Sequence, residues 1–234
     1  MRMIEKSLGF IGGGRVARII LGGLKRAGSF PENIVVSDIN EEVLERLKVS
    51  FSGIKVTKSN KEAASMDVVF LALHPPALME ALDDLRGAVR SEAIVVSLAP
   101  KITIKKLSST LGGHSKIVRI IPNASSYVNK GYNPIAFSEG ILEEDKEWIK
   151  KFMQKLGECP EVSEEMLEAY AVLTAMGPTY FEFQLYELYK IAVSFGLREQ
   201  EAEEGIEKML AGTVELMFRS GLDPEEVMDL IPVK

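Results

Sequence analysis

The chain has 234 residues, of which 46% are hydrophobic and 26% are charged, and its formal net charge is −6. This composition excludes a disordered chain, and the negative charge argues against a nucleic-acid-binding protein. The single cysteine excludes an internal disulfide and a cysteine-rich zinc site, and the presence of only two histidines argues against a histidine-based metal site. No apolar run reaches the ~18 residues of a membrane span.

The first 158 residues alternate between short apolar runs, typical of buried strands, and segments with apolar residues at helical spacing. Expected strands cover residues 7–11, 33–38, 54–57, 67–73, 93–98, 116–121 and 135–137. Expected helices cover residues 15–27, 41–48, 76–89, 103–111 and 143–156, and a brief helix follows Asn60, which can cap it. The alternation predicts an α/β domain over residues 1–158, a Rossmann-type doubly wound parallel sheet covered by helices on both faces.

After Cys159 the pattern changes to helices alone. They are expected over residues 163–176, 179–195 and 199–219, and Asp223-Pro224-Glu225-Glu226 is a capping box that opens a fourth. Residues 159–234 therefore predict a small all-helical second domain. The charge divides at the same boundary: residues 1–158 hold 23 Lys and Arg against 18 Asp and Glu, a net +5, and residues 159–234 hold 5 against 16, a net −11.

Aromatic residues gather at the start of this second domain. Seven of the 17 aromatic residues lie between residues 170 and 195. A helix that is apolar nearly all round is usually buried in a larger assembly. We therefore expect a homodimer formed through the C-terminal helices.

A glycine-rich loop joins the first strand to the first helix. Gly12-Gly13-Gly14-Arg15-Val16-Ala17 fits the pattern G-x-G-x-x-G/A, and Asp38 ends the second strand 21 residues after Ala17. In this pattern Gly12 allows a tight turn, Gly14 lets a pyrophosphate approach the backbone, and the helix N-terminus at Arg15 and Val16 binds the anion. The sequence therefore predicts a dinucleotide cofactor, NADP or NAD.

The choice between the two dinucleotides stays open. Asp38 could accept a hydrogen bond from a ribose 2′-hydroxyl, which favours NAD. Ser37 and Asn60 could instead donate to the 2′-phosphate of NADP, and Arg15 could reach it.

The strand over residues 67–73 runs into His74-Pro75-Pro76. Ligands in open α/β sheets bind outside the carboxyl ends of the strands, so Ala72, Leu73, His74 and Pro75 are expected beside the cofactor. His74 is a candidate cofactor contact, substrate contact or proton donor, and the alternative is a turn histidine in solvent. No catalytic residue is assigned, and His114 is expected on the surface.

Several of these segments resemble the pyrroline-5-carboxylate reductase family, which catalyses the last step of proline biosynthesis. Residues 9–17 are similar to that family's G-F-I-G-x-G-N-M-A, residues 60–63 to N-x-E-A, residues 71–75 to L-A-V-K-P, residues 118–123 to V-R-x-M-P-N, and residues 177–180 to the end of S-G-S-G-P-A-Y. The resemblance runs in order from about residue 7 to residue 231.

The resemblance implies hydride transfer from NAD(P)H to a small cyclic imine. It favours NADP slightly as the cofactor, whereas the local sequence around Asp38, followed by Glu41 and Glu42, favours NAD. The resemblance also implies a dimer of interleaved C-terminal helices, which in this family is sometimes assembled into a larger homo-oligomer. The substrate is expected where the helical domain of one subunit meets the cofactor domain. The residues it assigns to the cofactor are Gly12, Gly14, Arg15, Val16, Ser37, Asn60, Ala72, His74 and Pro75, with Ala99 in the segment similar to A-A-G. The candidate substrate contacts are Asn123, Thr174, Met176, Gly177 and Pro178.

The chain also departs from the family pattern. His74 replaces the usual lysine, Pro100 removes a backbone donor, Met176 stands where the family has a serine, and the sequence ends about where an S-P-G-G-T-T segment would start. Two alternatives therefore stay open: a deazaflavin (F420)-dependent NADP reductase, and a non-catalytic NAD(P)-binding protein. A cytoplasmic location is expected, with neither membrane nor nucleic acid as a partner.

Overall fold

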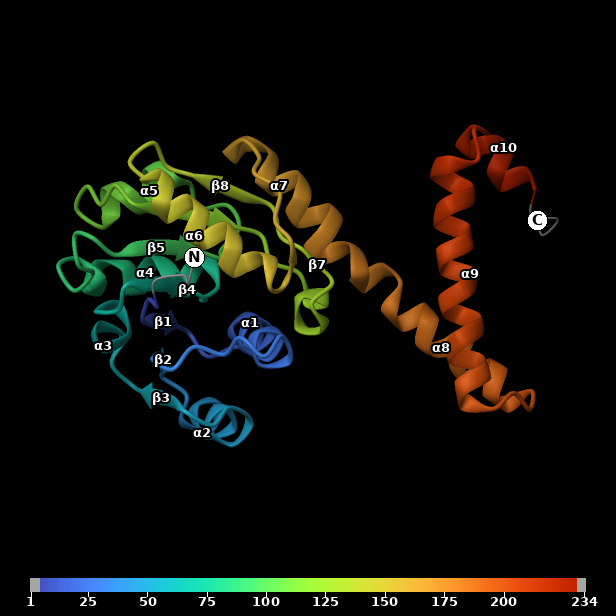
Figure 1. Cartoon of the computed structure of the whole chain (residues 1–234), viewed down its shortest axis with the longest axis horizontal. Coiled ribbons are helices and arrows are strands. Elements are labelled where there is room, and N and C mark those ends of the chain that lie inside the picture. The colour runs from blue at the N-terminus through green and yellow to red at the C-terminus, as the bar shows by residue number, and fades with distance from the viewer. Residues whose placement is uncertain (1–4, 231–234) are drawn as a thin grey trace. The chain divides into compact units, whose positions relative to one another are not determined.

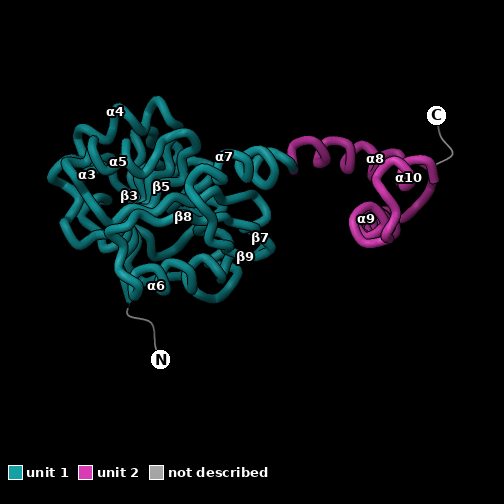
Figure 2. Tube along the Cα trace, turned by 90° about the horizontal axis from the view of Figure 1, so that it is seen from above, with its two compact units in different colours: residues 1–177 teal, residues 178–234 magenta. Residues whose placement is uncertain are grey.

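The computed structural model describes residues 5–230, and the chain divides into two compact units between Gly177 and Pro178 (Figure 2). The sequence pattern instead changes at Cys159. Residues 159–177 belong to the first unit, although they are mainly helical, because Leu167 is buried there against Ile121 and Ala136.

A seven-stranded sheet forms the centre of the first unit (Figure 1). Its strands lie in the order β3 (Ile54–Thr57), β2 (Ile34–Ser37), β1 (Leu8–Ile11), β4 (Val68–Leu71), β5 (Ile94–Ser97), β6 (Ile117–Ile120) and β8 (Ile135–Phe137). The strands from β1 to β6 are parallel, which confirms the doubly wound sheet. One edge departs from the expected parallel sheet, because β8 runs antiparallel to β6. Residues 121–134 connect these two strands through the 3₁₀ helix η1 (Ala124–Val128) and strand β7 (Gly131–Tyr132), without the α-helical crossover that usually joins parallel strands.

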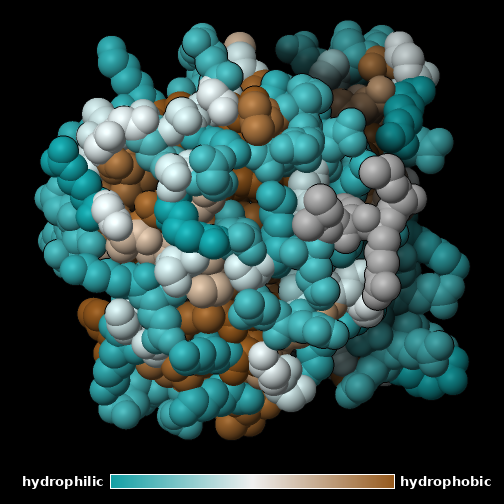
Figure 3. Space-filling model, turned by 60° about the vertical axis from the view of Figure 1, so that its left-hand side comes forward, coloured by the Kyte–Doolittle hydropathy of each residue, from teal (hydrophilic) through white to brown (hydrophobic). Residues whose placement is uncertain are grey.

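Helices cover both faces of the sheet, as Figure 2 shows from above. The helices α1 (Arg15–Arg26), α2 (Glu41–Ser50) and α6 (Glu143–Gln154) pack on one face, and α3 (Asn60–Ala64), α4 (Pro75–Leu85) and α5 (Ile104–Thr110) pack on the other. Alternate strand residues point to opposite faces, so Phe10 and Phe70 join the first core while Ile11 and Leu71 join the second. The surface over these layers is mainly hydrophilic in the view of Figure 3, with smaller hydrophobic patches showing through.

Some local predictions require correction. Asn60 does not cap α3: Ser59 is the N-cap residue, and the Asn60 Oδ1 atom accepts a hydrogen bond from Ser37 instead. The helix α4 ends at Leu85 rather than at Val89. Two short strands, β7 (Gly131–Tyr132) and β9 (Gly157–Glu158), pair in parallel, and each is too short to produce a recognisable sequence pattern.

The segment after Ser163 contains several kinds of helix. It runs through η2 (Glu164–Met166), α7 (Leu167–Tyr170), the π-helix η3 (Ala171–Met176) and the 3₁₀ turn η4 (Gly177–Tyr180). A helix break was predicted at Gly177-Pro178, but helical turns continue there with a different hydrogen-bonding pattern. Pro178 has no N–H group and cannot make the α-type bond to the Thr174 carbonyl, which favours such a change.

The second unit contains α8 (Glu182–Ser194), α9 (Glu199–Arg219) and α10 (Pro224–Asp229). The predicted capping box is confirmed: Asp223 accepts from the Glu226 backbone, and Glu226 accepts from the Asp223 backbone. Among the described residues of this unit, only Ala202 and Val227 are buried. Within residues 5–230, no helix combines the length and the apolar character that a membrane crossing requires.

Candidate cofactor site

The glycine loop lies between β1 and α1. The φ angle of Gly12 is +98°, and a Cβ atom at this position would lie 2.7 Å from the Ala72 carbonyl oxygen, so only glycine fits. Its N–H donates to the Ser37 carbonyl at 2.8 Å. The Gly13 N–H donates to Asp38 Oδ2 at 2.8 Å. Both bonds tie the loop to the end of β2.

Gly14 is the N-cap residue of α1 and has no side chain with which to cap the first turn. The first N–H groups of a helix have no partner within the helix. A Cβ atom placed on Gly14 would meet no protein atom within 4 Å, because this residue faces open space. The loop thus presents unpaired donors and a positive helix end to an unobstructed volume, which suits the pyrophosphate of a dinucleotide.

A pocket of about 440 Å³ opens in front of this loop at the carboxyl ends of the strands. It is lined by Gly12, Gly14, Arg15, Val16, Asp38, Ala72, Leu73, His74, Pro75, Ala77, Leu98 and Pro100. A smaller pocket of about 230 Å³ shares Gly12, Asp38, Leu73 and Ala77 with it. This smaller pocket is completed by Ser37, Ile39, Asn60, Glu80, Ala81 and Asp84. The shared residues make the two pockets neighbours, so together they offer adjoining spaces for the two halves of a dinucleotide.

Hydrogen bonds hold the polar residues at the end of β2. The two carboxylate oxygens of Asp38 accept from different backbone groups, the Gly13 N–H and, at 2.8 Å, the Asn40 N–H. The Ser37 hydroxyl donates to Asn60 Oδ1 at 2.8 Å. Because Asn60 Oδ1 is the acceptor of this bond, the Nδ2 group of Asn60 is left as a hydrogen-bond donor for a ligand.

Most of the predicted cofactor residues lie together at these pockets: Gly12, Gly14, Arg15, Val16, Ser37, Asp38, Asn60, Ala72, Leu73, His74 and Pro75. Two do not line them. Gly13 supports the loop through Asp38, and Ala99 is buried at 2% exposure. His74 is exposed at the N-cap of α4, where its carbonyl accepts from the Leu78 N–H. The expectation that His114 lies in solvent is wrong, because its Nε2 atom is 2.9 Å from the Ala93 carbonyl oxygen in a partly buried position.

The predicted substrate residues lie elsewhere. None of Asn123, Thr174, Met176, Gly177 and Pro178 lines either pocket. Asn123 Oδ1 accepts from the Tyr132 N–H at 3.3 Å, and the Thr174 hydroxyl donates to the Tyr170 carbonyl at 2.9 Å. Met176 is exposed on the π-helix η3.

Sequence reasoning missed one wall of the smaller pocket. Ala77, Glu80, Ala81 and Asp84 lie on α4 at spacings of three, one and three residues, which places them on one face of the helix. This spacing was visible in the sequence, but nothing local to α4 indicates that this face points to the end of β2.

A second missed feature is the buried Arg119, which is 1% exposed. Its Nη1 and Nη2 atoms donate to Glu164 Oε1 at 2.9 Å and Glu168 Oε1 at 2.7 Å. The same two carboxylate oxygens accept from the backbone N–H groups of Ile104 and Lys101. Burial disfavours the ionised form of Glu168, but the bonds from Arg119 and Lys101 outweigh it, so the pKa of Glu168 lies below its usual value.

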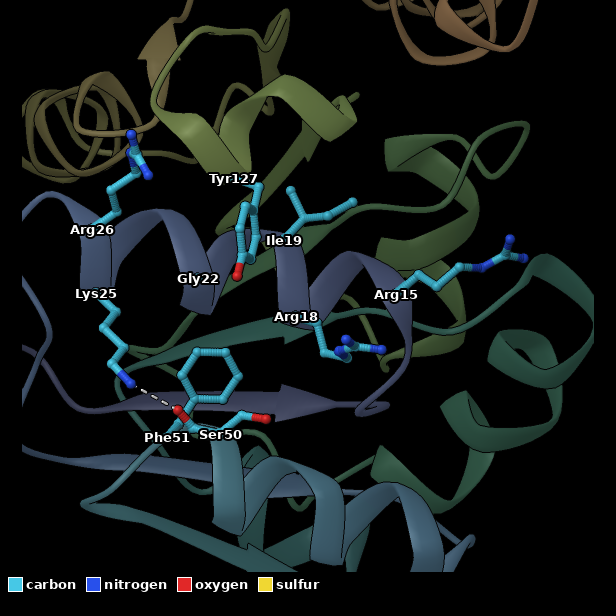
Figure 4. Close-up of a pocket in the computed structure, with 9 residues that line it drawn as sticks. All are labelled: Arg15, Arg18, Ile19, Gly22, Lys25, Arg26, Ser50, Phe51 and Tyr127. Carbon is cyan, nitrogen blue, oxygen red and sulfur yellow. Dashed lines mark hydrogen bonds between the residues drawn. The ribbon is translucent and has the colours of Figure 1, made fainter. Parts of the chain in front are cut away.

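A basic groove of about 570 Å³ runs along the outer side of α1 (Figure 4). It is lined by Arg15, Arg18, Ile19, Gly22, Lys25, Arg26, Ser50, Phe51 and Tyr127. Figure 4 shows Arg18 and Lys25 pointing toward α2, and Lys25 Nζ donates to the Ser50 carbonyl at 2.9 Å. Within residues 5–230, none of its four cationic side chains forms a salt bridge. Since Arg15 also lines the larger pocket, the groove extends a positive potential that attracts an anionic dinucleotide.

Family models match two parts of the chain. Residues 7–101 match the family described as NADP oxidoreductase, coenzyme F420-dependent. Residues 164–233 match the family described as pyrroline-5-carboxylate reductase dimerisation.

Curated relatives cover nearly the whole chain. The pyrroline-5-carboxylate reductase of Escherichia coli is 26% identical over 230 residues, 97% of this chain and 85% of its own length. Human pyrroline-5-carboxylate reductase 2 is 29% identical and matches 95% of this chain and 71% of its own length.

Solved structures share the fold. The pyrroline-5-carboxylate reductase of Coxiella burnetii is 28% identical, with a TM-score of 0.73, and is matched over 99% of this chain and 86% of that chain. The Plasmodium falciparum pyrroline carboxylate reductase, solved with NADP bound, is 21% identical, with a TM-score of 0.81 over 100% of this chain and 86% of that chain.

Proposed function

The chain belongs to the pyrroline-5-carboxylate reductase family, and from that premise we propose that it reduces the C=N bond of a small cyclic imine with NAD(P)H. The reaction is that of the last step of proline biosynthesis. The observation that carries the proposal is the pair of adjoining pockets in front of the glycine loop, at the carboxyl ends of the strands. A cytoplasmic location stays a prediction of the sequence.

The residues of the glycine loop fit the cofactor. The N–H groups at the start of α1 would bind the pyrophosphate, and Gly14 leaves room for it to approach. Leu73, Leu98 and Pro100 supply apolar walls to the larger pocket, which limit the access of water. When bound, the nicotinamide supplies the hydride, and the remaining task of the protein is to orient the imine carbon against it.

Little acid catalysis is required if the imine nitrogen arrives already protonated. His74 lines the pocket and is exposed, which keeps it a candidate substrate or cofactor contact. We propose that Asn123, Thr174, Met176, Gly177 and Pro178 contact the substrate. They line neither pocket within one chain, so a second copy of the chain is proposed to complete the site.

The second unit supports a homodimer. Its described part buries only Ala202 and Val227, whereas Phe183 is 70% exposed and Phe218 is 77% exposed. A unit without its own core depends on burying such side chains against a partner. The match of residues 164–233 to a dimerisation domain agrees with this reading.

The test is reduction of pyrroline-5-carboxylate by the purified chain, followed through loss of the reduced nicotinamide absorbance with NADH and with NADPH. The matched variants are Gly14→Val and Gly205→Ala, because a Cβ atom at either glycine meets no protein atom within 4 Å. Gly14→Val fills the volume proposed for the pyrophosphate and should abolish turnover and dinucleotide binding while the protein stays folded. Gly205→Ala, in α9, should retain both.

Other outcomes would redirect the assignment. Dinucleotide binding without turnover on any cyclic imine would favour a non-catalytic NAD(P)-binding protein. Electron transfer between NADPH and a deazaflavin would favour the alternative named by the family model over residues 7–101. Turnover that persists undiminished in Gly14→Val would contradict the proposed cofactor site.

A further inference from the structure

We propose that the cofactor pocket selects NADH against NADPH, and that Asp38, Glu80 and Asp84 together reject the 2′-phosphate. The proposal rests on the proposed function, because it assumes that a dinucleotide binds in front of the glycine loop. The carrying observation is that these three carboxylate residues line the smaller pocket at the end of β2, where a dinucleotide places its adenosine ribose.

All the charged residues that line this smaller pocket are acidic. None of its ten lining residues is a lysine, an arginine or a histidine. A phosphate monoester carries nearly two negative charges at neutral pH. Placing it among three carboxylates without a cation is therefore repulsive, while the uncharged 2′-hydroxyl of NADH can donate a hydrogen bond to one of them.

Asp38 is held in this pocket by two backbone groups. Its Oδ2 atom accepts from the Gly13 N–H and its Oδ1 atom accepts from the Asn40 N–H, both at 2.8 Å. Hydrogen bonds to an ionised acceptor are among the strong ones. The carboxylate cannot turn away to make room for a phosphate without breaking both bonds, one of which helps to hold the glycine loop.

Of the uncharged residues that line this pocket, only Asn60 keeps a side-chain donor, its Nδ2 group, and one neutral donor does not offset three carboxylates. The Ser37 hydroxyl donates to Asn60 Oδ1. Asn40 Oδ1 caps α2 by accepting from the Glu42 N–H, and Glu41 and Glu42 add negative charge to that helix start. The N-terminus of α2, which follows the pocket residues Asp38 and Ile39 along the chain, is therefore also unsuited to an anion, because acidic side chains already occupy it.

Three cations lie near the pocket in sequence or space, and none of them lines it: Lys58, Lys61 and Arg15. Lys58 Nζ forms a salt bridge with Glu41 at 3.0 Å. Arg15 lines the larger pocket and the basic groove, not the smaller pocket. Among the residues that line the two pockets, the one arginine, Arg15, thus lies at the larger pocket, where the pyrophosphate is expected, and not at the smaller pocket.

The test measures binding of NADH and of NADPH to the full chain by calorimetry, so that it does not depend on turnover. We expect NADH to bind at least about 10-fold more tightly than NADPH at low ionic strength. The double variant E80Q/D84N removes two charges from the α4 face and should bring the NADPH affinity up toward that of NADH, with little change for NADH itself. Asp83→Asn is the matched control, because Asp83 is exposed on the same helix and lines neither pocket.

The possible failures are distinct. Equal or tighter binding of NADPH by the unmodified chain would overturn the selectivity and leave the proposed reductase intact. A preference for NADH that E80Q/D84N leaves unchanged, or that Asp83→Asn relaxes equally, would overturn the role of Glu80 and Asp84. If neither dinucleotide binds, the proposed function itself fails.

Discussion

Arg119 Nη2 donates to Glu168 Oε1 at 2.7 Å, and this bond joins strand β6 to helix α7. The guanidinium is buried, and it also binds Glu164. Through the Lys101 and Ile104 N–H groups, the two carboxylates hold the segment that follows β5. That segment begins with Leu98 and Pro100 of the larger pocket, so we infer that Arg119 positions a wall of the cofactor site.

Replacing the two acidic partners of Arg119 should have strongly non-additive effects on the free energy of unfolding. Glu168→Gln leaves Arg119 paired with Glu164 and should cost about 1 kcal/mol of unfolding free energy. The double variant E164Q/E168Q leaves a buried guanidinium without a counter-charge and should cost about 3–5 kcal/mol. Urea unfolding of the single and double variants measures the coupling. If the cost of the double variant equalled the sum of the two single costs, the two carboxylates would not act together as counter-charges for Arg119.

The Glu168 contribution should depend on pH. Its pKa is lower in the folded protein than in the unfolded chain, so its stabilisation is present above the unfolded value, about 4.3, and is lost as the pH falls through the folded value. The difference in unfolding free energy between the unmodified chain and Glu168→Gln should therefore be constant from pH 7 to about pH 5.5 and shrink below about pH 4.5. If this difference in unfolding free energy grew on acidification, the pKa of Glu168 would be raised, not lowered, in the folded protein.

Two adjacent glycines of α1 should respond differently to alanine. A Cβ atom at Gly22 would overlap the ring of Tyr127, an exposed side chain that can turn aside, whereas one at Gly23 would overlap the backbone carbonyl of Ser126. Gly22→Ala should leave the free energy of unfolding nearly unchanged, because alanine favours the helix over glycine by about 1 kcal/mol, which offsets the cost of turning the Tyr127 ring aside. Gly23→Ala should lose about 2 kcal/mol or more in thermal or urea unfolding. Equal effects of the two substitutions would show that α1 packs loosely against Ser126 and Tyr127.

The only cysteine should be unreactive in the folded protein. Burial raises the pKa of the Cys159 thiol to about 12, which Lys150 opposes only weakly. The thiolate is the reactive form, so at pH 8 the folded chain should react with a thiol reagent at least about 100-fold more slowly than the chain in urea. Reaction at the same rate in both states would contradict the buried placement.

The exposed aromatic side chains of α8, Phe183 and Tyr186, should control association between two copies of the chain. Phe183→Glu places a charge on the face proposed to be buried between two copies, and it should shift the mass in solution from twice 25.8 kDa toward 25.8 kDa. Gln184→Glu introduces the same charge at the neighbouring exposed position and serves as the control. Light scattering coupled to size exclusion gives the mass. A 25.8 kDa mass for the unmodified chain at micromolar concentration would contradict the proposed dimer.

Local patterns in the sequence were sufficient to predict most elements and the glycine loop. Apolar runs identified the parallel strands, helical spacing and caps identified most helices, and the order strand, glycine loop, helix and Asp38 indicated the dinucleotide site. These features are readable because each depends on residues close in sequence, through backbone sterics, helix capping and the spacing of one face.

Only the tertiary structure decided which distant residues meet. Glu80 and Asp84 share a pocket with Asp38 because α4 crosses near the end of β2, and Arg119 meets Glu168 across 49 residues. The antiparallel direction of β8 and the use of Asn60 as the acceptor for Ser37 depend likewise on packing. Such contacts arise when separate elements are fixed against one sheet, and their partners cannot be read from spacing along the chain. The sequence alone therefore indicated that a dinucleotide binds and left the choice between NAD and NADP open, with Asp38 favouring NAD. The carboxylates of Glu80 and Asp84, which carry the proposed preference further, were found only in the folded pocket.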